Sequence, residues 1–531
     1  MDIDGKDRKE ILEKTNHRVS FISMIPCTSH FRRFQPPQDS AEKDLEKHST
    51  AKVKEKEFGG WKTFPFIIGN EICSTAAAGN MSANMIVYLT TQFNIKNIQA
   101  TNIINISNGG SQVAPLVGAF LADSYLGRFW TISIGSVVSF LALVLLTLTA
   151  IISSLRPPEC SPQLQAAGSC HGPSTAQYGV LYFYLALIIV ASGGINFNSS
   201  AFGADQFDKT SAEGMKKIHT FFNWYYFGLY SSFIIAATVI VYIQTNVSWA
   251  WGFGICAVLT GISAAFFFGG TKFYVRNRPE GSPFTGLAQV VVACVRKWHL
   301  QLPSKADDYY HAQIMESERL SLTQQLRFLN KAAIKTSQEF VSDGQLNPNP
   351  WKLCSVEQVE ELKSILKTLP ILSTAIIPSI MASQQITFSV LQALTMDRHL
   401  GRHFQIPAAS FIVFSILSSA IMLPIYDRVI VPSLARKGLK ITYLQRIGIG
   451  MILYCVGLAV AAMVESKRLN AEKSGAMVLQ MSALWLIPQN VIMGLADPFQ
   501  SVGWIDFFYN QFPEAVRSTA VSIVSIAAAM G

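Results

Sequence analysis

Charged residues are scarce in this chain of 531 residues. Asp, Glu, Lys and Arg together make up 15% of it, whereas an average soluble protein carries about a quarter. Hydrophobic residues make up 50%, and they lie in long blocks. The 34 Phe, 16 Tyr and 9 Trp residues exclude an intrinsically disordered chain. These features argue against a large soluble enzyme and indicate an integral membrane protein.

Motifs for enzymatic chemistry are also lacking. The eight Cys residues show no metal-ligand spacing, and neither a phosphate-binding loop nor a nucleophile–base pair is visible. The polar N-terminus has no apolar segment, so we expect no cleaved signal peptide. The net charge of +9 reflects basic residues in the loops between apolar blocks, which membrane topology explains better than nucleic-acid binding. We therefore expect no enzyme activity, no cofactor, no metal and no nucleic-acid partner, but contact with a lipid bilayer.

The apolar blocks have the length of membrane-spanning helices, about 20 residues each. Six come first, at 64–91, 99–122, 129–152, 178–200, 219–243 and 248–271. Four follow a charged segment, at 361–383, 405–426, 441–464 and 477–505. An eleventh begins near Ser518 and is about half a span long at Gly531. This pattern predicts an all-α membrane protein with two six-helix halves, in which the chain ends within the eleventh helix.

The same pattern divides the chain into four parts. We expect a cytosolic N-terminal tail, a six-helix half, a cytosolic linker and an incomplete second half, at 1–62, 63–271, 272–360 and 361–531. Basic residues near the helix ends place the tail and the linker in the cytosol. That orientation puts Cys160 and Cys170 in one outer loop, where the sequence permits either a disulfide or two free thiols.

Several strings of residues carry a family resemblance. The spacing of Gly118, Asp123, Gly127 and Arg128 is typical of the loop between the second and third helices of the major facilitator superfamily. Four further strings occur along the chain in the order that the family shows. They are Gly59-Gly60-Trp61-Lys62, Phe202-Gly-Ala-Asp205-Gln-Phe-Asp208, Phe221-Phe-Asn223-Trp-Tyr225-Tyr226 and Phe508-Tyr509-Asn-Gln-Phe-Pro513-Glu514. With these strings the chain resembles the plant nitrate/peptide transporter family, the plant branch of the proton-dependent oligopeptide transporters.

The resemblance implies a secondary transporter that moves a small solute by alternating access around a cavity between its halves. In that family the first helix carries two acids and a base for proton coupling. Here the first acid is kept as Glu71, whereas Ser74 and Thr75 replace the second acid and the base. The Lys or Arg usual in the fourth helix is replaced by Asn196. Three mechanisms stay open: proton symport with fewer acids, uncoupled facilitated diffusion or export, and a truncated sensor without transport.

Two acids lie inside predicted spans, Glu71 and Asp497. Each is nine residues from a charged residue at the cytosolic helix end, which corresponds to a depth of roughly 13 Å. Ionisable groups at such depth are typically functional, so we expect protonation or substrate binding there. Five further candidate cavity contacts are Ser74, Thr75, Asn196, Asn223 and Tyr226. The pair Asp123 and Arg128 is the candidate cytosolic gate.

The predicted cavity is rich in amides and hydroxyls, and no Lys or Arg is evident deep in a span. Anions usually bind to Lys, Arg or helix N-termini, so nitrate is less favoured as a substrate; a peptide is less favoured as well. A neutral polyhydroxylated solute such as a glycoside, or another organic metabolite, fits the cavity better. The expected location is the plasma membrane, with the vacuolar membrane as the alternative.

Overall fold

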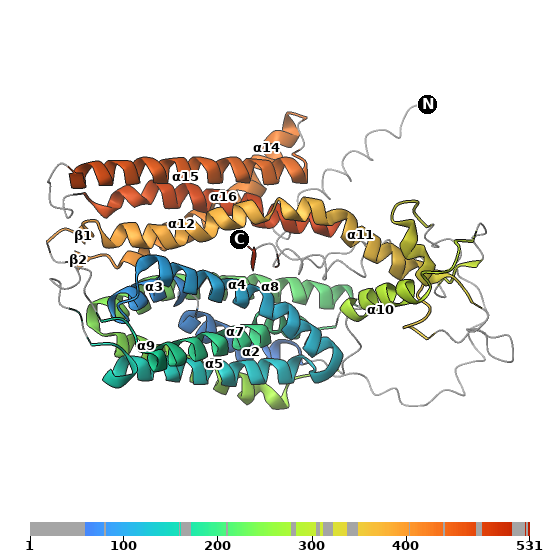
Figure 1. The fold of residues 1–531 in the computed structure, drawn as a ribbon, viewed down its shortest axis with the longest axis horizontal. Coiled ribbons are helices and arrows are strands. Elements are labelled where there is room, and N and C mark those ends of the chain that lie inside the picture. Colours follow the sequence, from blue (N-terminus) through green and yellow to red (C-terminus); the bar gives the residue numbers. More distant parts are fainter. Residues whose placement is uncertain are drawn as a thin grey trace, which may run out of the picture.

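The computed structural model describes residues 59–78, 81–158, 160, 171–208, 211–277, 283–303, 308–311, 322–336, 349–402, 404–438, 441–473, 481–511, 526 and 529–530. Most of these residues lie in helices. Two short strands, β1 (His399–Leu400) and β2 (Phe404–Gln405), form an antiparallel hairpin. The long helices run alongside one another, with the first half of the chain (blue to green) on one side and the second half (orange to red) on the other (Figure 1). The all-α prediction is confirmed.

The first half consists of seven described α-helices. They are α2 (Phe64–Ala78), α3 (Met81–Thr91), α4 (Asn97–Leu121), α5 (Arg128–Ile151), α7 (Thr175–Ala204), α8 (Ala212–Ile235) and α9 (Trp249–Gly269). Two π-helical turns, η4 (Ala236–Ile240) and η5 (Ile243–Val247), extend α8. Glycines let these helices approach closely: Gly118 of α4 packs against the backbone of Gly193 in α7.

The segment between the halves forms a small helical unit of its own. Helix α10 (Pro283–Arg296) and the 3-10 helix η9 (Arg327–Ala333) pack against the start of α11 (Val356–Ser373). Their apolar side chains form one buried cluster, which includes Val290, Leu329 and Val359. This unit lies beyond the ends of the long helices, at the right of Figure 1.

The second half begins with a bent helix pair. Helix α11 is followed by α12 (Ile376–Leu394), and the two meet at an angle of 48°. Pro370 and Pro378 flank the bend, where each removes a backbone donor. The span expected at 361–383 is therefore longer and not straight. The remaining helices are α13 (Ile412–Ile425), α14 (Val431–Arg436), α15 (Tyr443–Lys473) and α16 (Ile487–Gln511).

Six helices among the described residues are long and apolar enough to cross a membrane, or seven if the bent pair counts as one span. Three spans that the sequence predicted fall outside this count. The span predicted at 64–91 is described as the shorter helices α2 and α3, and the other two correspond to α4 and α16. Helices α4 and α16 have 25 residues each, long enough at about 1.5 Å per residue, but amides and hydroxyls lower their hydropathy. The eleventh span predicted from Ser518 lies outside the described residues, apart from three positions.

The two halves meet along a few helices. Helix α12 contacts α3 and α4, and α13 contacts α8. Near the β-hairpin the halves share one hydrophobic core, in which Tyr88 and Phe93 of the first half lie with Val390 and Phe411 of the second. The family resemblance of the sequence implies a solute-binding site along this junction.

Candidate functional site

Glu71 of α2 is a buried carboxylate held by hydroxyl groups. Its side chain accepts a hydrogen bond from Ser199 Oγ of α7 at 2.9 Å and from Thr75 Oγ1, one turn along α2, at 3.4 Å. The hydroxyl of Tyr225 on α8 lies beside the same carboxylate. Glu71 is 7% exposed, and within the described part of the chain no Lys or Arg forms an ion pair with it. Side chains of α2, α7 and α8 thus surround the Glu71 carboxylate, and none of these side chains is a cation.

The structure brings some of the predicted contacts to Glu71 and leaves others away from it. Thr75 bonds to it directly, and Tyr226 lies within electrostatic range. Ser74 is half-buried on α2, and Asn196 is exposed on α7. Asn223 lies on α8, but its side chain is outside the described set. Sequence reasoning missed Tyr225 and Ser199 as partners of Glu71, although both occur in polar or aromatic strings beside the residues that it chose.

Asp497 lies in the other half, on α16. Ser419 Oγ of α13 donates a hydrogen bond to it at 3.2 Å. A buried cation lies near by: Arg446 of α15 donates to the carbonyl of Pro498 at 3.2 Å and stacks over Tyr426, 4.1 Å from the ring centre. Arg446 is 5% exposed. Arg446 lies in the first turn of α15, so a buried cation is present near Asp497 at the end of a span.

A row of tyrosines on α8 runs between the two acids. Tyr226 lies near Glu71, and Tyr230, one turn further, lies near Asp497. Because α8 belongs to the first half and Asp497 to the second, Tyr230 and Asp497 face each other across the junction between the halves, where α8 also contacts α13.

The predicted gate pair forms within the first half. Arg128, at the start of α5, lies 3.3 Å from Asp123 and 2.6 Å from Asp205 at the end of α7. Gly127 makes the turn between them with a φ of +77°, a conformation that favours glycine. These contacts join α4, α5 and α7, so they fasten three helices of one half together. Asp205, which the sequence strings included, is the partner that the prediction missed.

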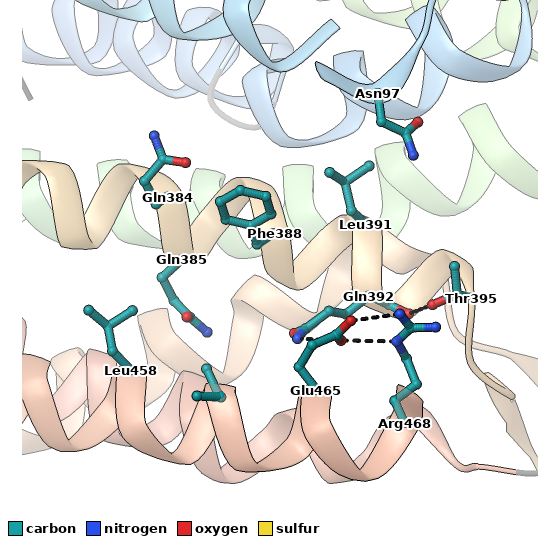
Figure 2. A pocket seen from close by; sticks show the side chains of 12 residues that line it. Asn97, Gln384, Gln385, Phe388, Leu391, Gln392, Thr395, Leu458, Glu465 and Arg468 are labelled. Atoms are coloured by element: carbon teal, nitrogen blue, oxygen red, sulfur yellow. Dashed lines mark hydrogen bonds and ion pairs between the residues drawn. The ribbon is translucent and has the colours of Figure 1, made fainter. Parts of the chain in front are cut away.

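A cavity of about 470 Å³ is lined mainly by α12 and α15 of the second half and by Asn97 of the first, near the end that carries the β-hairpin. Figure 2 shows Asn97 of α4 on one side and residues of α12 and α15 on the other. Its polar lining consists of Asn97, Gln384, Gln385, Gln392, Thr395, Glu465 and Arg468. None of the residues predicted for the site lines this cavity. Helix α15 continues past its predicted end at 464 to Lys473, which brings Arg468 into the wall.

The wall of the cavity contains a hydrogen-bonded chain and one free donor. Gln489 donates to Gln392 at 3.0 Å, and Gln392 donates to Glu465 at 3.0 Å. Glu465 also pairs with Arg468 at 2.6 Å. Gln385 is 5% exposed, and its Nε2 has no partner among the described residues. A buried amide nitrogen without a partner is costly, so it indicates a place for an acceptor atom of a ligand.

Most of the described cysteines are free thiols. Cys160 is disulfide-bonded; its predicted partner Cys170 lies outside the described residues, so that pairing stays a prediction. Of the described cysteines, Cys73, Cys256, Cys294, Cys354 and Cys455 are free thiols. Over the described ranges, no group of three His, Cys, Asp or Glu side chains could hold a metal ion.

The chain is similar to known proteins over most of its length. The model of the POT family (PTR2) matches residues 129–531. Protein NRT1/PTR FAMILY 2.13 of Arabidopsis thaliana is 43% identical over 493 residues, which cover 90% of this chain and 78% of the relative. Protein NRT1/PTR FAMILY 2.9 of the same plant is 39% identical, over 91% of this chain and 84% of the relative.

Solved structures show the same fold. The POT family transporter PepTSo superposes with a TM-score of 0.66 at 19% identity, covering 88% of this chain and 87% of the other. An auto-inhibited POT family peptide transporter gives a TM-score of 0.65 at 20% identity, covering 88% and 86%. At such identities the likeness supports the architecture alone, and the major facilitator arrangement predicted from the sequence is confirmed.

Proposed function

This chain belongs to the POT family of multi-pass membrane transporters, and we propose that it moves a small polar organic solute by alternating access, coupled to protons through Glu71 and Asp497. The observation that carries the coupling is the hydroxyl cage around Glu71. A carboxyl group held by Ser199, Thr75 and Tyr225 can gain or lose a proton without breaking an ion pair. Family members that use two acids and a base must break such a pair.

Asp497 is the second protonation site of the proposal. It lies on α16, in the opposite half to Glu71, and Tyr230 of α8 lies within electrostatic range of it. When the two halves move relative to each other during alternating access, the distance between Asp497 and α8 changes. The electrostatic environment of the Asp497 carboxylate then changes as well. An acid at a moving junction therefore supports coupling between proton binding and alternating access.

The solute is proposed from the lining of the cavity. Amide groups of Gln384, Gln385 and Gln392 offer both donors and acceptors, and Phe388 offers a ring face. The Glu465–Arg468 pair has no net charge. Such a wall suits a neutral, oxygen-rich solute such as a glycoside better than nitrate. Solved relatives are described as peptide transporters, so a short peptide is the substrate class against which the proposal must be tested.

Uptake into oocytes tests the proposal. Cells expressing the chain are given labelled glycosides, dipeptides and nitrate in mildly acidic and in neutral medium, and Asp497→Asn is measured beside the unaltered protein. We expect glycoside uptake that is faster in the acidic medium, and we expect the variant to lose that difference. Equal flux in both media, unchanged in the variant, would show an uncoupled facilitator. Uptake of peptide or nitrate alone would overturn the solute assignment. A fluorescent fusion checks the proposed plasma-membrane location against the vacuolar membrane.

Gln385→Leu separates solute binding from folding. Leucine fills nearly the same volume and removes a buried donor without a partner, so we expect the melting temperature of the solute-free protein to stay level or rise. The KM for the solute should increase roughly tenfold, because a site built to donate a hydrogen bond loses one. Thermal unfolding and concentration-dependent uptake measure the two effects. An unchanged KM would show that the solute does not reach this part of the cavity.

A further inference from the structure

One threonine of the linker makes several polar contacts with α11, beside the apolar cluster and the His311–Glu357 pair that also join the two. The backbone N–H of Thr323 donates to Glu360 Oε1 at 2.9 Å, and its hydroxyl donates to Glu360 Oε2 at 2.9 Å. Lys363 Nζ donates to the Thr323 carbonyl at 3.1 Å and forms an ion pair with Glu360 at 2.6 Å. Both oxygens of one buried carboxylate are thus held by a single linker residue.

Two lysines and one glutamate surround the hydroxyl of Thr323. The ammonium groups of Lys363 and Lys367 each lie 3.4 Å from Thr323 Oγ1. Lys363 is fully buried and Glu360 is 7% exposed, whereas Thr323 itself is exposed and lies outside any helix or strand. An exposed hydroxyl in irregular backbone, between two cations and next to a carboxylate, is a place where added negative charge would rearrange existing contacts.

We propose that Thr323 is a phosphorylation site that weakens the attachment of the linker to α11. A protein kinase would transfer the γ-phosphoryl group of ATP to Thr323 Oγ1: the new P–O bond replaces the bond to the bridging oxygen of ATP, ADP leaves, and the hydroxyl proton passes to the kinase base. No oxidation or reduction takes part. The inference goes beyond the proposed transport and requires only that the linker faces the cytosol, where ATP is available.

The physical consequence follows from the contacts. Phosphorylation removes the hydroxyl donor that Glu360 now accepts, and it places a group of about −1.5 to −2 charge beside that carboxylate. The phosphate oxygens can take Lys367 and Lys363 as partners, because both ammonium groups already lie near Oγ1. Glu360 then loses its linker contacts and is repelled. Since α11 is the first part of the bent span, the linker would hold this helix less firmly, through the apolar cluster and the His311–Glu357 pair that remain.

Hydrogen exchange on the purified full-length protein tests the inference. The protein is incubated with ATP and a cytosolic plant extract, the phosphate on each linker residue is located by mass spectrometry, and exchange is then compared with the untreated protein. We expect phosphate at Thr323. We expect exchange in the first turns of α11 to rise by about tenfold, the factor for one lost hydrogen bond to a charged group.

Variants supply the controls. Thr323→Asp should reproduce the faster exchange, whereas Gln324→Asp, which adds the same charge one residue along, should not. Glu360→Gln in the Thr323→Asp background should restore slow exchange, because the repulsion is gone. Phosphate on other linker residues but none at Thr323 would overturn the site, and unchanged exchange in phosphorylated protein would overturn the switch. Transport is not measured, so a failed transport proposal leaves this test unaffected.

Discussion

Glu71→Gln should abolish the stimulation of solute uptake by acid while leaving the folded protein intact. Glutamine has the shape of glutamate, and the hydroxyls of Ser199, Thr75 and Tyr225 can accept as well as donate, so the cage survives the change. What disappears is the proton that the carboxyl group carries. We expect uptake in mildly acidic medium to fall at least tenfold, since interactions with a charged group are worth about 1.5–3 kcal/mol. Initial rates of uptake in acidic and neutral medium measure the effect.

A matched pair of serines provides the control. Ser199 donates to Glu71, whereas the hydroxyl of Ser200, the next residue of α7, is directed to the carbonyl of Phe197. Ser199→Ala should therefore shift the pH dependence of uptake, and Ser200→Ala should leave it as in the unaltered protein. If Glu71→Gln keeps its acid-stimulated uptake, Glu71 is a structural carboxylate and the coupling proposal fails.

Gly118→Ala should largely eliminate folded protein from the membrane. A Cβ atom at this position would lie 1.7 Å from the carbonyl oxygen of Gly193 and 2.5 Å from its carbonyl carbon. These are backbone atoms of α7, so no side-chain rotation relieves the clash and the two helices must separate. Overpacking costs about 1–3 kcal/mol even where side chains can adjust, and here we expect the upper end or more. The yield of monodisperse protein after detergent extraction measures the loss.

The control for this prediction lies on the facing helix. Gly179 of α7 has no atom within 4 Å of an added Cβ, and alanine is favoured over glycine in a helix by about 1 kcal/mol. Gly179→Ala should therefore give the same yield as the unaltered protein, or more. Equal yields for the two alanine variants would show that α4 and α7 do not pack at Gly118 and Gly193 as described.

The course of the helices could be predicted only in part. Hydropathy located the blocks because each needs about 20 apolar residues to cross a bilayer, and α5, α7 and α9 begin and end within a few residues of the prediction. It misjudged α15, whose last turns are polar, and the bent pair α11–α12, whose course depends on proline and on packing against the linker. Polarity marks where a chain leaves lipid, and a helix can continue beyond that point.

The sequence by itself determined the class of this protein and its family, and it singled out the two acids inside its predicted spans, because these depend on composition, on the order of motifs and on the cost of placing charge in lipid. Tertiary structure alone decided the partners of those acids. Ser199 and Tyr225 reach Glu71 from helices more than a hundred residues further along the chain, and the free amide of Gln385 faces a cavity built from both halves. Such contacts depend on how helices rotate and cross when they pack, and residue order does not fix that geometry.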